Sequence, residues 1–94
     1  MFTPQEMALR IAHLAQAKRL AINFSQKTLS ERSGVSFGVI KKFERTGKIS
    51  LESLLKIALA LDALSEFNEL FKASDNLNSL DALLQEKTRK RGRL

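Results

Sequence analysis

The sequence contains no cysteine, no tryptophan and no tyrosine, and only one proline and four glycines among 94 residues. Without cysteine, disulfide bonds, thiolate metal sites and cysteine nucleophiles are excluded, and a reducing compartment is weakly favoured. No apolar run approaches the roughly 18 residues of a membrane span, and the amino end lacks the basic and apolar regions of a secretory signal. We therefore expect a cytoplasmic protein that is not embedded in a membrane.

Motifs for catalysis and metal binding are also missing. His13 is the only histidine, so a zinc or iron site has almost no ligands, and we expect His13 to be on the surface or half-buried on the first helix. No nucleophile elbow, glycine-rich phosphate loop or metal motif surrounds the serines and aspartates. A chain of this length makes about one small domain with little room for a catalytic cleft. The sequence predicts neither an enzyme nor a bound cofactor.

Positive charge is abundant but unevenly distributed along the chain. The 16 Lys and Arg residues exceed the 10 Asp and Glu residues, for a net charge of +6. Residues 1–50 have a net charge of +6, residues 51–86 of −5 and residues 87–94 of +5. The basic balance favours a polyanionic partner, and the asymmetry indicates two faces with different partners.

Signals for the start and end of helices predict an all-α chain, because the alternation typical of strands is absent. Hydroxyl side chains that can cap a helix stand at the start of five predicted helices, and they are Thr3, Ser25, Ser36, Ser50 and Ser65. Thr3, Pro4 and Glu6 have the spacing of a capping box with proline in the first turn. Apolar periodicity then predicts helices over about 4–20, 26–33, 37–45, 65–71 and 79–86, and one more helix that begins at residue 51.

The apolar pattern also predicts which faces are buried. The helix that begins at Leu51 has apolar residues around most of its circumference, so we expect it to be the buried centre of the domain. In the first helix, Ile11 and Leu14 belong to the expected inward stripe. In the helix over 65–71, the residues expected to point inward are Phe67, Leu70 and Phe71.

Residues 25–44 have the spacing of a helix-turn-helix. Two short helices meet at Gly34, which supplies the left-handed residue of the turn, and the small Ser30 lets the second helix cross close to the first. The apolar residues expected to hold the crossing angle are Leu29, Val35, Ile40 and Phe43. The alternative is an αα-hairpin with no role in nucleic-acid binding.

This segment resembles the Cro and phage-repressor (XRE-type) helix-turn-helix family over about residues 8 to 72. The resemblance is carried by residues 25–36, SQKTLSERSGVS, and by residues 50–61, SLESLLKIALAL. It implies a five-helix lambda-repressor-like DNA-binding domain, here residues 1–72. The extension over 73–94 adds a short helix and a basic tip. The resemblance also implies that Arg19 and Glu44 pair to orient the recognition helix.

The extension is similar in composition to that of HipB-type antitoxins, the DNA-binding partners of HipA-like kinases. This similarity implies a homodimeric autorepressor that binds double-stranded operator DNA and holds a HipA-like toxin kinase or its accessory subunit. The alternative function is a protein-interaction module that neutralises or scaffolds a kinase, with weak or accessory DNA binding. RNA binding is disfavoured because no aromatic stacking platform is present.

The basic tip over 87–94 has three interpretations between which the sequence does not decide. It is a solvated tail, an arm that contacts DNA, or a peptide that folds on a partner protein.

A recognition helix that enters the major groove N-terminus first presents its first, second and sixth residues to the bases, here Phe37, Gly38 and Lys42, with Lys41 beside them. Lys42 can donate to guanine, Phe37 can contact a thymine methyl group, and Gly38 has no side chain, so part of the discrimination would come from DNA shape. The alternatives are a buried Phe37 and lysines that are merely solvated. The residues predicted to contact phosphates are Gln26, Lys27, Ser36, Arg45 and Lys48.

We expect a homodimer because two-fold symmetry matches palindromic half-sites and one recognition helix buries little surface. The predicted dimer or partner contacts are the apolar residues near the end of the chain, Phe67, Leu70, Phe71, Leu80, Leu83 and Leu84.

Overall fold

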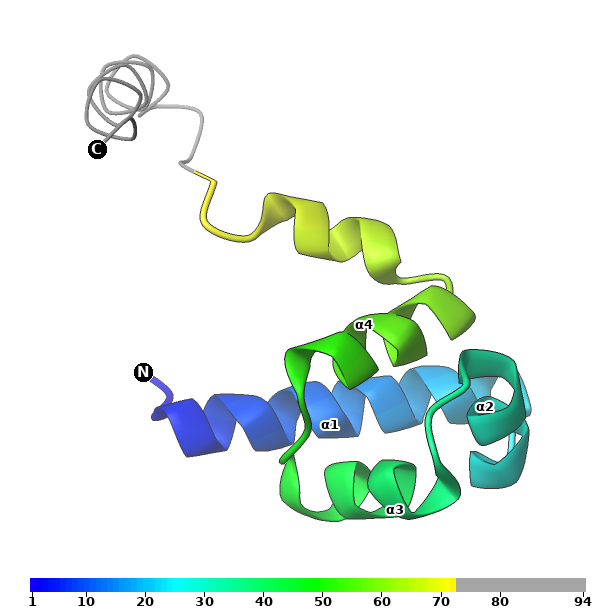
Figure 1. Cartoon of the computed structure of the whole chain (residues 1–94). Helices are drawn as coiled ribbons and strands as arrows, with labels where there is room; N and C mark the ends of the chain where they lie inside the picture. The colour runs from blue at the N-terminus through cyan, green and yellow to red at the C-terminus, as the bar shows by residue number, and fades with distance from the viewer. Residues whose placement is uncertain (73–94) are drawn as a thin grey trace, which may run out of the picture.

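The computed structural model describes residues 1–72, which form four α-helices and one 3₁₀ helix (Figure 1). In chain order these are α1 (Pro4–Ala21), α2 (Gln26–Ser33), α3 (Phe37–Thr46), α4 (Leu51–Ala60) and η1 (Leu64–Glu69). This part of the chain contains no strand, so the predicted all-α class is confirmed. The helix predicted over 79–86 and the basic tip lie outside the described residues, and the domain boundary after residue 72 stays a prediction.

Side-chain caps begin all four α-helices, as predicted. The Glu6 backbone N–H donates to Thr3 Oγ1 at 3.1 Å, and the Thr3 N–H donates to the Glu6 carboxylate at 2.8 Å, which completes the capping box. Ser25, Ser36 and Ser50 each accept a hydrogen bond from the third residue of their helix. A cap of this kind stabilises a helix by about 1 kcal/mol, so local interactions fix where these helices begin.

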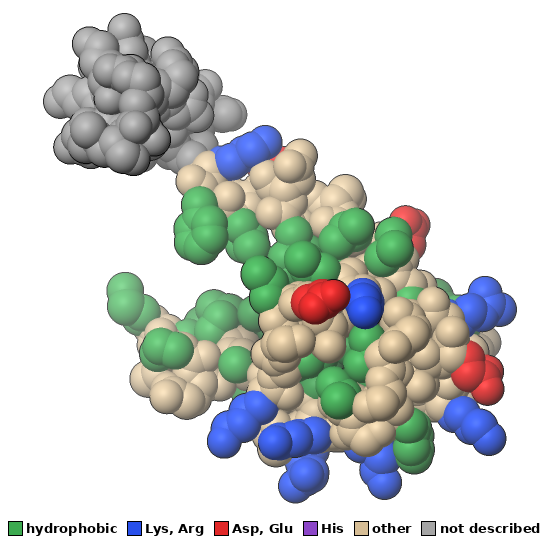
Figure 2. Space-filling view, viewed as in Figure 1, with side chains coloured by type: hydrophobic (Ala, Val, Ile, Leu, Met, Phe, Trp, Pro, Cys, Tyr) green, Lys and Arg blue, Asp and Glu red, His purple; other side chains and the backbone are tan. Residues whose placement is uncertain are grey.

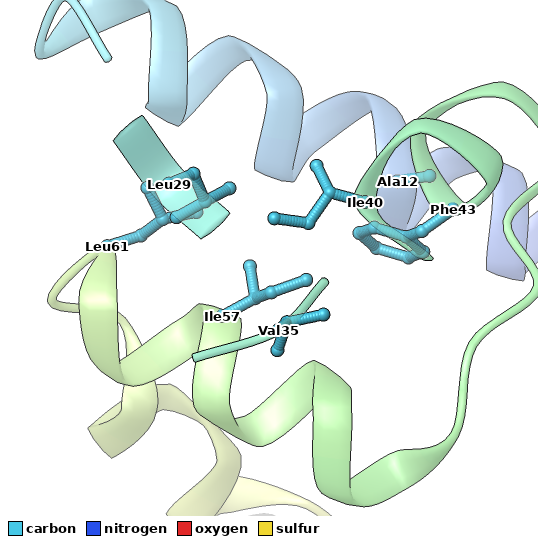
Figure 3. Packing of buried hydrophobic residues seen from close by; sticks show 7 residues of the cluster. All are labelled: Ala12, Leu29, Val35, Ile40, Phe43, Ile57 and Leu61. Atoms are coloured by element: carbon cyan, nitrogen blue, oxygen red, sulfur yellow. The ribbon is translucent and has the colours of Figure 1, made fainter. Parts of the chain in front are cut away.

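The helices surround one hydrophobic core. α1 runs through the middle of the molecule, with α3 on one side of it and α4 and η1 on the other, and α2 lies near its C-terminal end (Figure 1). α3 packs on α1 and α2, whereas α4 packs on α2 and η1. The buried residues of the core cluster are Ala12, Leu29, Val35, Ile40, Phe43, Ile57 and Leu61 (Figure 3). All four apolar residues predicted to hold the helix-turn-helix belong to this cluster.

The prediction that α4 is the buried centre is wrong. Ile57 and Ala58 are buried, but Leu51 and Leu59 are 65% and 66% exposed. α4 covers the core with one face only, so the apolar residues on its other face remain on the surface. On α1, Leu14 is likewise exposed rather than inward, and the smaller Ala12 is buried instead.

The fifth element also differs from the prediction. It begins at Leu64 as a 3₁₀ helix without a side-chain cap, rather than as a helix capped by Ser65. Phe67 is half-buried, but Leu70 and Phe71 are exposed rather than inward. The helix ends at Glu69, and Phe71 adopts a φ of +65°, so both residues lie beyond the helical turn that would have directed them inward.

Within residues 1–72, no helix has the length and apolar character needed to cross a membrane. In the same part of the chain, no three His, Cys, Asp or Glu side chains gather in a way that could hold a metal ion.

Candidate nucleic-acid interface

The turn between α2 and α3 is held by glycine and by serine hydroxyl groups. Gly34 ends α2 with a φ of +79°, in the left-handed conformation, and its N–H donates to the Ser30 carbonyl oxygen at 2.9 Å. The Ser30 hydroxyl donates to the Val35 carbonyl oxygen at 2.6 Å, and the Val35 N–H donates to Ser33 Oγ at 3.1 Å. Ser30 is therefore more than a small residue at a helix crossing, because its hydroxyl ties the turn together.

α3 presents two different faces. Ile40, Phe43 and Glu44 are buried, and they attach the helix to the rest of the domain. The residues predicted to read bases lie on the exposed side, and they are Phe37, Gly38, Lys41 and Lys42. Because the first turn of α3 is among these exposed residues, the N-terminus of the helix is accessible from solvent.

Phe37 lies on the surface and pairs with Lys41. Its side chain is 46% exposed, and Lys41 Nζ lies 5.3 Å from the centre of the Phe37 ring. This is within the range of a cation–π interaction. The alternative of Phe37 as a core residue is therefore not what the structure shows. Lys41 thus lies on the side of α3 on which Phe37 lies.

Cationic side chains gather around α3. Figure 2 shows Lys and Arg side chains along the lower edge of the molecule, where Figure 1 shows α3. Among the described residues, the exposed cations predicted to contact DNA form no ion pair with a carboxylate, and they are Lys27, Lys41, Lys42, Arg45 and Lys48. Their charge is thus available to attract phosphate groups.

A buried ion pair connects α1 to the inner face of α3. Arg19 Nε donates to Glu44 Oε2 at 2.8 Å and Arg19 Nη2 donates to Glu44 Oε1 at 3.0 Å, in a bidentate arrangement. Arg19 Nη1 donates to the Phe24 carbonyl oxygen at 2.7 Å. Both charged side chains belong to residues that are only 6% exposed. Planar bidentate pairing is a strong and directional arginine–carboxylate contact, and here it joins α1 to α3.

Gln26 also belongs to this hydrogen-bonded network, and the sequence does not predict this contact. Gln26 Nε2 donates to Glu44 Oε1 at 2.9 Å across 18 residues of sequence. An amide nitrogen has two N–H donors, so one remains for another acceptor. Gln26 is also the first residue of α2, whose N-terminal N–H groups favour an anion. The half-buried Gln26 is therefore held in place rather than free on the surface.

The other predicted phosphate-contacting residues lie close to helix ends. Lys27 is exposed in the first turn of α2, and Arg45 is exposed in the last turn of α3. Lys48 is exposed just after α3. The Ser36 hydroxyl accepts from the Val39 N–H at 3.2 Å, so its capping role occupies one of its acceptor sites.

Gly47 has a role that the sequence does not reveal. A Cβ atom at Gly47 would lie 2.8 Å from backbone atoms of Ala8 and Leu9, and its φ is +80°. By its residue type, a glycine at this position indicates only that a helix ends there. In the structure it also lets the C-terminal end of α3 lie directly against the backbone of α1.

α3 is a capped helix with an exposed cationic face, and a left-handed turn joins it to α2. The Arg19–Glu44 pair connects its inner face to α1. This arrangement is that of a helix-turn-helix domain of the DNA-binding class. A family model described as helix-turn-helix matches residues 16–67. The chain belongs to this helix-turn-helix family, of the XRE type. The family is one of DNA-binding regulators and is typically non-enzymatic, and the arrangement of helices is compatible with the lambda-repressor-like fold. Searches among curated proteins and among solved structures found no match to the chain.

Proposed function

We propose that the protein is a sequence-specific transcriptional repressor that inserts α3 into the major groove of operator DNA. The observation that carries this proposal is the two-faced character of α3. Phe43 and Glu44 fix its inner face to the domain, and Lys41, Lys42 and Arg45 are exposed on its outer side. A rigidly supported helix with unpaired cations fits a polyanionic groove of its own width.

The residues of α3 divide into two roles in this proposal. Lys42 donates to the O6 and N7 atoms of a guanine, and the exposed ring of Phe37 contacts a thymine methyl group. Lys41, held beside Phe37, contacts the wall of the groove, and Gly38 leaves room for close approach to the bases. The phosphate contacts come from Gln26, Lys27, Ser36, Arg45 and Lys48, and they set register rather than sequence.

The repressor acts as a homodimer in this proposal, because two copies can read two half-sites about one helical turn apart. One of the predicted contact residues supports it, since Phe71 is an exposed apolar residue. Phe67 and Leu70 both line a cavity between α1, α4 and η1, so they are less available to a second copy. The predicted contacts Leu80, Leu83 and Leu84 lie outside the described residues.

Lys42→Ala should reduce discrimination between the operator and unrelated DNA. Loss of a good contact to a guanine edge reduces discrimination by about 1–3 kcal/mol, which is roughly 5- to 150-fold. Mobility shifts on the protein's own promoter and on a scrambled duplex measure this ratio. Lys56→Ala removes the same charge from α4, on the other side of α1, and serves as the matched control.

Arg45→Ala should weaken binding to both duplexes by the same factor. Arg45 lies at the C-terminal end of α3, where a contact to phosphate carries no sequence information. The slope of log K against log salt should become shallower by about 1, measured between about 50 and 200 mM salt. If neither Lys42→Ala nor Arg45→Ala changes operator affinity, the proposed interface is wrong.

At a finer level, we propose that this repressor is the cytoplasmic antitoxin of a HipA-like kinase. The support is the resemblance of the extension, together with a surface that DNA binding does not require. On α4 and η1 the exposed acidic residues are Glu52, Glu66 and Glu69, and each lies within ion-pair distance of a lysine, so this surface is one of mixed charge. Both elements lie away from α3 (Figure 1). Such a surface favours a protein partner. The alternative function is an interaction module for that kinase, in which DNA binding is only accessory.

Co-purification with the product of an adjacent kinase-like reading frame tests the antitoxin proposal. The full chain should retain the kinase, and a chain that ends at Asp75 should lose it while keeping the described domain. Retention of the kinase by the shortened chain would contradict the role of the extension.

A further inference from the structure

A cavity of about 260 Å³ opens between α1, α4 and η1. Apolar side chains form most of its wall, including Ile11, Leu14, Leu54, Ile57, Phe67 and Leu70. Figure 2 shows apolar side chains gathered on this side of the molecule, between η1 and the other helices. The cavity therefore presents an apolar face on the side of α1 that is away from α3.

The chemistry of the cavity favours apolar side chains over a small-molecule ligand. Its charged lining residues, Lys18 and Glu66, lie within ion-pair distance of each other at 3.7 Å. Ligand sites usually combine a volume of about 300–1,000 Å³ with several convergent polar groups. This cavity is smaller, and its charged groups face each other rather than a ligand. A few leucine side chains match both its size and its polarity.

The chain itself supplies such side chains beside the cavity. Leu70 lines the cavity, and the described residues end two positions later, at Lys72. The sequence continues with 22 residues, in which Leu80, Leu83 and Leu84 have the spacing of one helical face. Residues 73–78 can extend over about 20 Å, so these leucines are within reach of the whole cavity.

We propose that residues 79–86 dock into this cavity of their own chain, with Leu80, Leu83 and Leu84 against α1, α4 and η1. Residues 73–78 form a short tether, so the effective concentration of the docking segment at its own cavity is in the millimolar range. At protein concentrations below this value, docking within one chain is favoured over docking into a second copy. The docked segment covers Leu14 and Leu70, and it leaves Leu59 and Phe71 available to a second copy. The inference goes beyond operator binding and does not depend on it, because the cavity does not involve α3.

The absence of cysteine allows a direct test in the full chain. Leu14→Cys combined with Leu84→Cys places one thiol at the cavity and one in the docking segment. His13→Cys combined with Leu84→Cys is the matched control, because His13 is the exposed neighbour of Leu14 and does not line the cavity. Leu14 is 54% exposed, so its replacement should preserve folding, which circular dichroism checks.

Under mild oxidation, the Leu14→Cys variant should close an intramolecular disulfide at least about tenfold faster than the His13→Cys control, because a disulfide needs Cα atoms about 4.4–6.8 Å apart. Non-reducing electrophoresis and intact mass measure the closed monomer, and its rate should not change on dilution. Equal rates for the two variants would overturn the proposal. Cross-linked dimers that form in preference to closed monomer would also overturn it and assign the cavity to a second copy. Mobility shifts with the same variants report operator binding separately.

Discussion

Replacing Glu44 with alanine should lower the free energy of unfolding by about 3–5 kcal/mol. The substitution leaves the buried Arg19 guanidinium without its bidentate carboxylate and removes the acceptor of the Gln26 amide. An uncompensated buried charge is among the most destabilising changes in a small domain. Because total stability is usually about 5–15 kcal/mol, the variant should be close to unfolding. Urea denaturation followed by far-ultraviolet circular dichroism measures the change in a chain that has no tryptophan or tyrosine.

The control for this prediction is a glutamate–lysine ion pair on the surface. Glu52 and Lys56 are one turn apart on α4, 3.8 Å from each other, and their side chains are largely exposed. Glu52→Ala should therefore change the free energy of unfolding by no more than about 0.5 kcal/mol. If the two alanine variants were equally stable, the Arg19–Glu44 pair would have no special role in holding α3.

A double variant separates the stability of the domain from the positioning of α3. Replacing Arg19 with methionine and Glu44 with leucine removes both buried charges, so part of the lost stability should return. Gln26 still lacks its acceptor in this variant, because Glu44 supplies it. We therefore expect a folded protein with weaker operator binding, by a similar factor on every duplex, since a phosphate contact is the one affected.

Local features of the fold could be predicted from the sequence because each depends on neighbouring residues. The hydroxyl of Thr3 or Ser25 caps a helix through a contact three residues away, and a left-handed turn residue such as Gly34 is marked by its type. The sequence places Phe37 and Lys42 on α3 away from its apolar face, but it leaves open whether Phe37 is buried, and the structure shows it exposed. Fold class and the position of the recognition helix thus depend on short-range patterns.

Features that depend on tertiary packing could not be predicted in this way. The apolar pattern of α4 does not indicate how many neighbours the helix has, and Leu51 and Leu59 are exposed because only one face is covered. The contact of Gln26 with Glu44 spans 18 residues and joins two helices. From the sequence, Gln26 is predicted only to contact a phosphate, whereas the fold also joins its half-buried side chain to the buried Arg19–Glu44 pair.

Gly47→Ala should destabilise the domain by about 2–5 kcal/mol. The left-handed φ of +80° disfavours any residue with a Cβ atom, by about 1–2 kcal/mol. The new methyl group would also lie 2.8 Å from the backbone of Ala8 and Leu9, and forcing atoms into a packed region destabilises by about 1–3 kcal/mol more. Because backbone atoms cannot rotate away as a side chain can, α3 must shift relative to α1. Urea denaturation measures the loss of stability.

Gly34→Ala is the matched control, because it separates backbone strain from steric overlap. Gly34 has nearly the same φ, +79°, but a Cβ atom at this position would have no atom of another part of the chain within 4 Å. The control should lose only the conformational part, about 1–2 kcal/mol. Equal losses for the two variants would show that the contact between Gly47 and α1 contributes nothing. We expect a larger loss of stability for Gly47→Ala than for Gly34→Ala. If operator binding by Gly47→Ala is also weaker under conditions where this variant is fully folded, the contact between Gly47 and α1 holds α3 at the angle needed to enter the groove.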